Sequence, residues 1–225
     1  MRHFPAFVTA SLITALCVCA PGQNTPSKDP QVNETKGIPP RATPADYQAH
    51  AAAGTVTVAA EFIGHSVPTP DGPTYTTEDY VAVETGLYGP SGARLKISSD
   101  DFSLRVSVKK TTSLPSQPFG MVFRSLKDPE WEDSVAVEAK SKSNTSISTG
   151  GKNGEKEPVA PVHMPLDLQR AMQQRVQKAA LPEGDRALPR AGLIFFPYRG
   201  KTKNIRSMEL VYAGPAGTAT LTLQP

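Results

Sequence analysis

Cysteine is scarce in this chain: its 225 residues include two, Cys17 and Cys19, and both lie in an apolar stretch near the start. If that stretch is a cleaved export signal, the remaining chain has no thiol. This excludes disulfides, thiolate metal sites, iron–sulfur clusters and a cysteine nucleophile. Long apolar runs are scarce as well, because no later segment approaches the roughly 20 apolar residues that span a bilayer. Proline, by contrast, is abundant, with 22 residues, and argues against a mainly helical protein.

The first twenty residues fit a secretory signal. Arg2 makes the start basic, the stretch from Ala6 to Ala20 carries no charge, and Cys19 lies between small residues where a signal peptidase would cut. Two alternatives stay open, namely a lipid anchor on Cys19 and an uncleaved membrane anchor. We expect cleavage after residue 20, and therefore a secreted or periplasmic protein.

Two further segments lack the apolar side chains needed for a core. Residues 21–45 hold six prolines and few large apolar groups, which predicts a disordered leader. Residues 139–161 are rich in Ser, Gly and Lys, which predicts a long flexible loop. Without these segments and the first twenty residues, about 155 residues remain, a size that suits one domain, assigned to residues 46–225.

Most of the remaining chain shows the alternation of apolar and polar residues that is typical of strands. Glycine- and proline-rich turns separate the segments, which predicts a mainly β fold, an antiparallel β-sandwich of seven or eight short strands. The predicted strands cover residues 55–63, 80–88, 102–108, 120–123, 193–196, 205–212 and 218–223.

One segment, residues 166–181, has helical spacing instead. Leu168, Met172, Val176 and Ala179 fall on one face, and Pro165 suits a first helical turn. This predicts one amphipathic helix of about four turns, inserted before the last strands and packed on the sandwich or over an edge. Its apolar stripe could alternatively be a partner-binding face.

The sequence contains no recognisable catalytic or metal-binding motif. A zinc-protease helix, a Gly-x-Ser-x-Gly nucleophile elbow and a phosphate-binding glycine loop are all missing. We therefore predict no catalytic residue, metal or cofactor. An exported hydrolase remains the alternative, and it would need a pocket that brings together at least two of five acidic or imidazole side chains: His65, Asp71, Glu84, Asp100 and Asp101. The last two could alternatively hold calcium.

Charge is unevenly distributed along the chain. Residues 128–138 include five acids and no base, whereas residues 186–206 include six bases and no acid. A predicted hairpin over residues 199–206 would concentrate positive potential at its tip.

This basic hairpin is the candidate binding site, with Arg199, Lys201, Lys203 and Arg206 as its residues. It could hold an anionic polymer or surface, or it could be a solvated turn whose charges prevent edge pairing. Nucleic acid is disfavoured as a partner, because Tyr198 is the one aromatic residue nearby on which a base could stack.

Four segments resemble strands of the immunoglobulin-like accessory domains of secreted bacterial proteins, many of which belong to families of unknown function. They are residues 80–85, 101–104 (the Asp-Phe-Ser-Leu motif), 189–196 and 205–212. The resemblance covers residues 54–223 except 139–188. It implies an immunoglobulin-like fold and supplies no catalytic residues to carry over.

The sequence thus favours a non-catalytic secreted or periplasmic β-sandwich with a binding or structural role in the cell envelope. Its partner would be an envelope or extracellular protein or an anionic polymer. The alternatives are the exported hydrolase and an anion-binding module that acts through residues 199–206.

Overall fold

The computed structural model describes residues 36–132, 134–135 and 163–225, and these fold mainly into antiparallel strands. The mainly β prediction is therefore confirmed. The predicted signal at 1–20 and the predicted loop at 139–161 lie outside the described residues.

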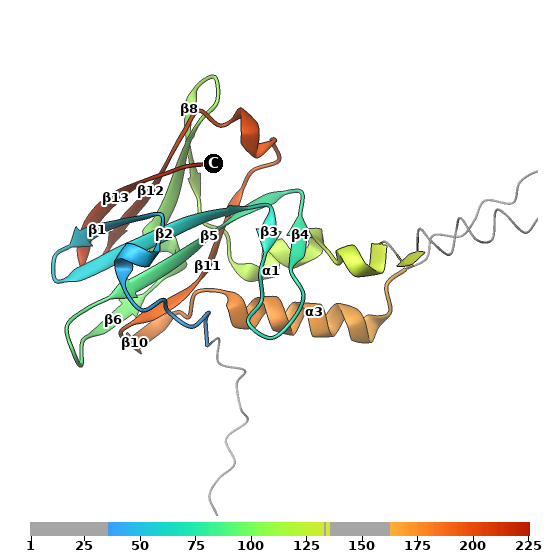
Figure 1. The fold of residues 1–225 in the computed structure, drawn as a ribbon, viewed down its shortest axis with the longest axis horizontal. Coiled ribbons are helices and arrows are strands. Elements are labelled where there is room, and N and C mark those ends of the chain that lie inside the picture. The colour runs from blue at the N-terminus through green and yellow to red at the C-terminus, as the bar shows by residue number, and fades with distance from the viewer. Residues whose placement is uncertain (1–35, 133, 136–162) are drawn as a thin grey trace, which may run out of the picture. The chain divides into compact units, whose positions relative to one another are not determined.

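Two four-stranded sheets form the centre of the fold (Figure 1). The first sheet consists, in spatial order, of β1 (Ala49–Ala53), β2 (Val56–Gly64), β5 (Tyr80–Tyr88) and β11 (Arg190–Pro197). The second consists of β13 (Gly217–Leu223), β12 (Ser207–Gly214), β7 (Phe102–Ser107) and β8 (Thr111–Pro115).

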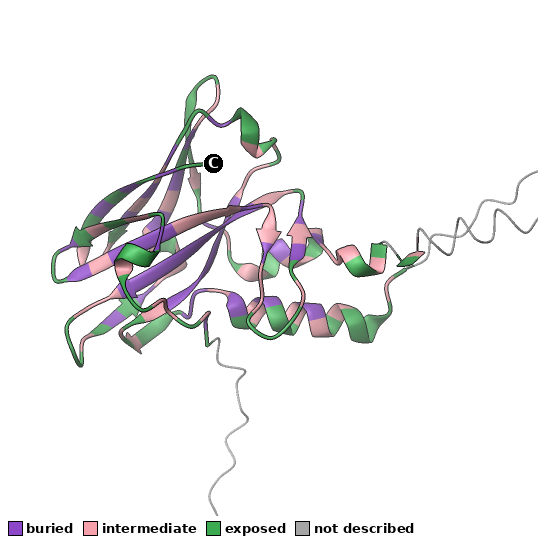
Figure 2. Ribbon diagram, viewed as in Figure 1, coloured by how far each residue is buried: buried purple, intermediate pink, exposed green. Residues whose placement is uncertain are grey.

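The two sheets share one apolar core. Alternate residues of each strand point inward, as in Val81, Val83 and Leu87 of β5, and Leu104 and Val106 of β7. All five are less than 4% exposed. Figure 2 shows these buried positions running through both sheets. Two antiparallel sheets around a single core fit the predicted β-sandwich.

The edges of the two sheets meet on both sides. On one side β1 lies beside β13, where the side-chain amide of Gln48 donates to the carbonyl of Gln224 at 3.1 Å. On the other side the chain after β8 reaches β11, where the backbone N–H of Gln117 donates to the carbonyl of Phe195 at 2.8 Å. The sheet edges are thus largely covered by the chain itself.

A second layer covers the outer face of the first sheet. It contains the helix α3 (Leu166–Ala179), the short helices α1 (Phe119–Val122) and η3 (Phe123–Ser125), and a small sheet of β3 (Ser66–Val67), β4 (Tyr75–Thr77) and β9 (Leu126–Lys127). Met172, Val176 and Ala179 of α3 pack with Leu193 and Phe195 of β11 in a second apolar cluster. The predicted amphipathic helix is therefore present. Three of its four predicted stripe residues are covered, whereas Leu168 is exposed.

The remaining elements are short. A two-stranded sheet pairs β6 (Arg94–Ile97) with β10 (Gly184–Ala187), and three 3-10 turns are η1 (Pro44–Asp46), η2 (Ser99–Asp101) and η4 (Thr202–Asn204). The helix α3 ends two residues earlier than predicted, because Ala180 is extended and bridges Leu193.

The strand predicted at residues 120–123 is wrong. This segment forms α1 and the start of η3, and it follows the extended residue Pro118, whose carbonyl accepts a hydrogen bond from the N–H of Met121 at 2.9 Å. Gln117 already takes the position beside β11, so the chain turns away from the sheet and buries Val122 in the second cluster.

The disordered leader predicted at residues 21–45 does not hold for its last ten residues. Ile38 forms a bridge with Ala191 of β11, and Arg41 forms ion pairs with Glu61 and Glu84 on the first sheet. The anchoring contacts are therefore mainly polar, which a search for apolar groups does not detect. Residues 21–35 lie outside the described part.

Candidate functional site

The basic segment 199–206 is not a hairpin, which corrects the sequence-based prediction. β11 pairs with β5 in the first sheet, whereas β12 pairs with β13 and β7 in the second. The segment between them, which includes η4, therefore crosses from one sheet to the other. β11 and β12 therefore do not pair with each other, although they are neighbours along the chain.

Specific hydrogen bonds hold this crossing segment in place. The backbone N–H of Tyr198 donates to the carbonyl of Asp79 at 2.9 Å, and Nε of Arg199 pairs with Oδ1 of Asp79 at 2.8 Å. Further along, the backbone N–H of Arg206 donates to the carbonyl of Ser107 at 2.8 Å. The position of the segment is thus fixed at its start by the first sheet and at its end by the second.

His65 supports the middle of the crossing segment. Its Nδ1 lies 2.8 Å from the carbonyl oxygen of Tyr80, and its Nε2 lies 2.9 Å from that of Gly200. Its ring also stacks on Tyr198, with centroids 6.3 Å apart and an angle of 25° between the planes. Both ring nitrogens are therefore engaged with backbone carbonyls, so His65 holds the segment in position.

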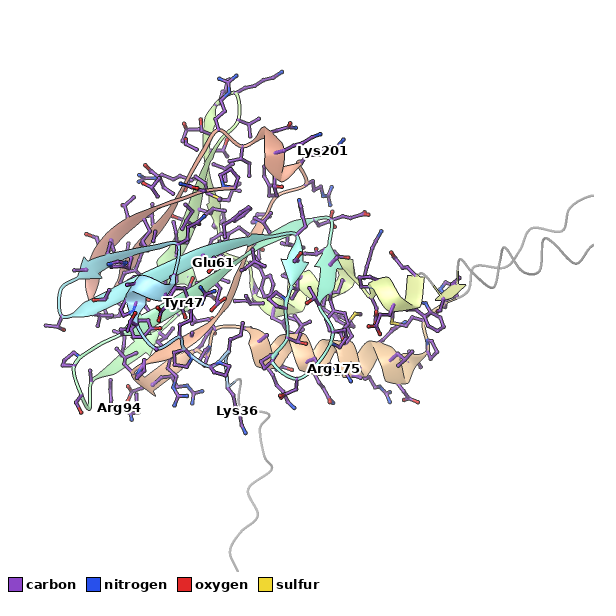
Figure 3. The ribbon with its side chains drawn as sticks, viewed as in Figure 1. Lys36, Tyr47, Glu61, Arg94, Arg175 and Lys201 are labelled. Carbon is purple, nitrogen blue, oxygen red and sulfur yellow. The ribbon has the colours of Figure 1, made fainter. Side chains whose placement is uncertain are left out.

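The charges of the four predicted site residues are not equivalent. Arg199 is neutralised by Asp79. Lys201, Lys203 and Arg206 are exposed, and no carboxylate among the described residues pairs with them. Figure 3 shows Lys201 pointing away from the sheets. Three of the four predicted residues thus present an uncompensated positive charge.

Two further lysines, which the sequence reasoning missed, lie at the same end of the sheets. Lys109 and Lys110 form the turn between β7 and β8, where the N–H of Val108 donates to the carbonyl of Lys110 at 3.5 Å. The turn is next to the crossing segment, because Arg206 bonds Ser107 at the end of β7. We call the five exposed cations from these two connections the basic end: Lys109, Lys110, Lys201, Lys203 and Arg206.

A groove opens at the basic end. Its volume is about 530 Å³, and its lining consists of apolar side chains from β7, β8 and their turn together with one aromatic ring and two lysines: Val106, Val108, Lys109, Lys110, Thr112, Leu114 and Tyr198. This volume lies within the roughly 300–1,000 Å³ of small-molecule sites. The groove joins two chain segments that are far apart in the sequence. The adjacent Lys109 and Lys110 could have indicated a charged turn from the sequence alone. Nothing in the sequence places Tyr198 beside that turn.

The residues considered for a hydrolase have separate structural roles. His65 contacts two carbonyls, Asp71 is exposed in the loop before β4, and Glu84 pairs with Arg41. Asp100 and Asp101 lie in η2, where burial raises the pKa of the Asp101 carboxyl. Among the described residues, no three His, Cys, Asp or Glu side chains gather where they could hold a metal ion.

Glu84 belongs to a charged cluster on the outer face of the first sheet. It lies directly opposite Glu61 in the register of β2 and β5, and the guanidinium of Arg41 contacts both carboxylates, with 2.9 Å between Nη2 and Oε2 of Glu84. The ring of Tyr47 packs 4.4 Å from the same guanidinium. Burial opposes the charge on Arg41, but its bonds to Glu84 and Glu61 outweigh this and raise its pKa. The cluster therefore anchors residues 36–47 to the sheet.

Two observations complete the description of the site. No helix in the described part of the chain is long and apolar enough to cross a membrane. Comparisons of the chain with protein-family models, with curated proteins and with solved structures found no match.

Proposed function

We propose that this protein is a non-catalytic, exported β-sandwich of the immunoglobulin-like kind that binds an anionic partner in the cell envelope through its basic end. One observation carries the proposal. Five exposed cations come from two connections that adjoin where the N–H of Arg206 donates to the carbonyl of Ser107, and no described carboxylate pairs with them.

The clustering of these cations favours an anionic partner for a physical reason. Like charges within about 8–10 Å repel one another at physiological ionic strength, so grouping them stabilises nothing in the free protein. Arg199 shows the contrast, because the structure supplies Asp79 as its counter-ion. A partner with several negative charges would supply the counter-ions that the basic end lacks.

The contacts that the ionisable side chains make within the fold support a role without catalysis. A general base needs a free lone pair and access to a substrate. Each ring nitrogen of His65 faces a backbone carbonyl, at 2.8 and 2.9 Å, so neither is open to a substrate, and the carboxylates of Glu61 and Glu84 share Arg41. Binding at the basic end requires none of these groups to react.

Export and the immunoglobulin-like fold are parts of the proposal that rest on different observations. The basic start, the uncharged apolar stretch and the small residues around Cys19 support export. Two antiparallel sheets around one core support the immunoglobulin-like fold.

The test is binding of the purified protein to inorganic polyphosphate, measured by isothermal titration calorimetry at two salt concentrations. The test variant combines four substitutions: Lys109→Ser, Lys110→Ser, Lys201→Ser and Lys203→Ser. Each exposed ion pair contributes about 0.5 kcal/mol, so we expect binding to weaken about 30-fold, and we expect salt to weaken wild-type binding more than variant binding.

A matched control also removes four positive charges, at exposed positions away from the basic end: Lys36→Ser, Lys96→Ser, Arg124→Ser and Lys178→Ser. We expect this control to bind nearly as the wild type does. Equal losses in both variants would show a non-specific effect of net charge, and no binding by the wild type would refute the proposal.

A further inference from the structure

We infer that the groove at the basic end binds a single acyl chain whose anionic head group lies on Lys109 and Lys110. This inference rests on the proposed function and names the class of ligand, a free single-chain anionic amphiphile such as a fatty acid.

The floor of the groove is apolar and continuous with the core. Val106 is 3% exposed and belongs to the core shared by the two sheets, and Val108, Leu114 and Tyr198 pack against that core while remaining partly exposed. An acyl chain in the groove would therefore contact side chains that are already held in position. Each methylene that leaves water in this way strengthens binding by about 4-fold.

The rim of the groove supplies the charge. Lys109 and Lys110 line it, and of its described lining residues none is acidic. Lysine can lay its aliphatic stem along an apolar chain while its ammonium group contacts an anionic head group. The hydroxyl of Thr112 offers an additional hydrogen bond at the same rim.

A second hollow beside Tyr198 shows what distinguishes the groove. It has a similar volume, about 460 Å³, and is lined by Asp79, Tyr80, Pro197, Tyr198, Arg199 and Gly200. Its two charged residues pair with each other at 2.8 Å, so it presents no free charge to a ligand. The groove thus combines an apolar floor with uncompensated cations, which suits an anionic amphiphile better than a purely polar polyanion.

The experiment titrates the purified protein with octanoate, decanoate and dodecanoate, each below its micelle concentration, by isothermal titration calorimetry. We expect affinity to rise with chain length, by up to about 4-fold per methylene. The variant Thr112→Trp places a large ring in the groove from an exposed strand position and should lower dodecanoate affinity at least 10-fold. The matched control Thr220→Trp, at an exposed position on β13, should leave it unchanged.

The outcomes separate this inference from the proposed function. Thr112→Trp keeps all five cations, so it should bind polyphosphate as the wild type does. If polyphosphate binds but fatty acids do not, or bind independently of chain length, the inference is overturned and the proposed function stands. Binding to anionic phospholipid vesicles without binding to monomeric fatty acids would also overturn it. Unfolding midpoints of the variants verify that each remains folded.

Discussion

Replacing one buried hydroxyl should make this protein more stable. The side chain of Thr85 is fully buried on the inner face of β5, and its Oγ1 has no hydrogen-bond partner in the described structure. Thr85→Val replaces this hydroxyl with a methyl group of nearly the same size and keeps the branched shape that strands favour. The fold therefore gains an apolar contact and loses a polar atom that is removed from water without compensation.

The size of the effect follows from two contributions. A buried hydroxyl without a partner costs about 1–3 kcal/mol relative to the unfolded chain, and an added buried methyl contributes up to about 0.8 kcal/mol. Allowing for imperfect fit in the core, we expect the free energy of unfolding to rise by about 1.5 kcal/mol. For a domain of this size that raises Tm by about 3–6 °C.

The matched control is the same substitution at Thr77. This residue is 1% exposed, but its Oγ1 lies 2.7 Å from Oγ of Ser125. Thr77→Val breaks that bond and should lower the free energy of unfolding by about 1–2 kcal/mol. Urea unfolding monitored by circular dichroism measures both variants. If the two substitutions shift stability in the same direction, the reasoning from unsatisfied hydroxyl groups is refuted.

Three further predictions concern single positions. Arg41→Met leaves two glutamates opposite each other without a counter-ion and should lower the free energy of unfolding by about 2 kcal/mol, measured with urea; a change below about 0.5 kcal/mol would contradict the anchoring role. Burial raises the pKa of Asp101, so the native state binds its proton more tightly than the unfolded chain does, and its contribution to stability is lost as pH rises through the native pKa. Asp101→Asn should therefore gain stability relative to wild type between pH 3 and pH 7, and a constant difference in urea unfolding would refute this. Gly192→Ala would place a Cβ 2.4 Å from Cα of Leu181 and should cost more than about 3 kcal/mol in thermal unfolding, whereas the control Gly120→Ala meets no atom within 4 Å and should be tolerated.

The sequence predicted strands best where the alternation was long. Residues 80–88 form β5 with the predicted bounds, and the predicted strand at 102–108 becomes β7, one residue shorter. The four-residue apolar run at 120–123 was too short to tell a strand from a helix, because both periods fit so few positions. Its helical state depends on Gln117 occupying the position beside β11, which is a tertiary contact.

The candidate site was predictable in charge but not in shape. The basic residues after Tyr198 stand out in the sequence. All four are exposed, and three of them have no carboxylate partner among the described residues. Their hairpin was inferred from adjacency along the chain, which does not reveal that β11 pairs with β5 and β12 with β7. Lys109 and Lys110 are visible as a pair, yet only the fold places them beside Tyr198.

The contact between β1 and β13 has a consequence for the order in which the chain can fold. These strands come from opposite ends of the described fold. The edge of the first sheet at β1 therefore stays uncovered until β13 has been synthesised and has reached it. Such long-range closure slows folding, because a large loop must be ordered before its contacts form. The edge at β1 is therefore among the last parts of the fold to be covered, although β1 itself is synthesised early.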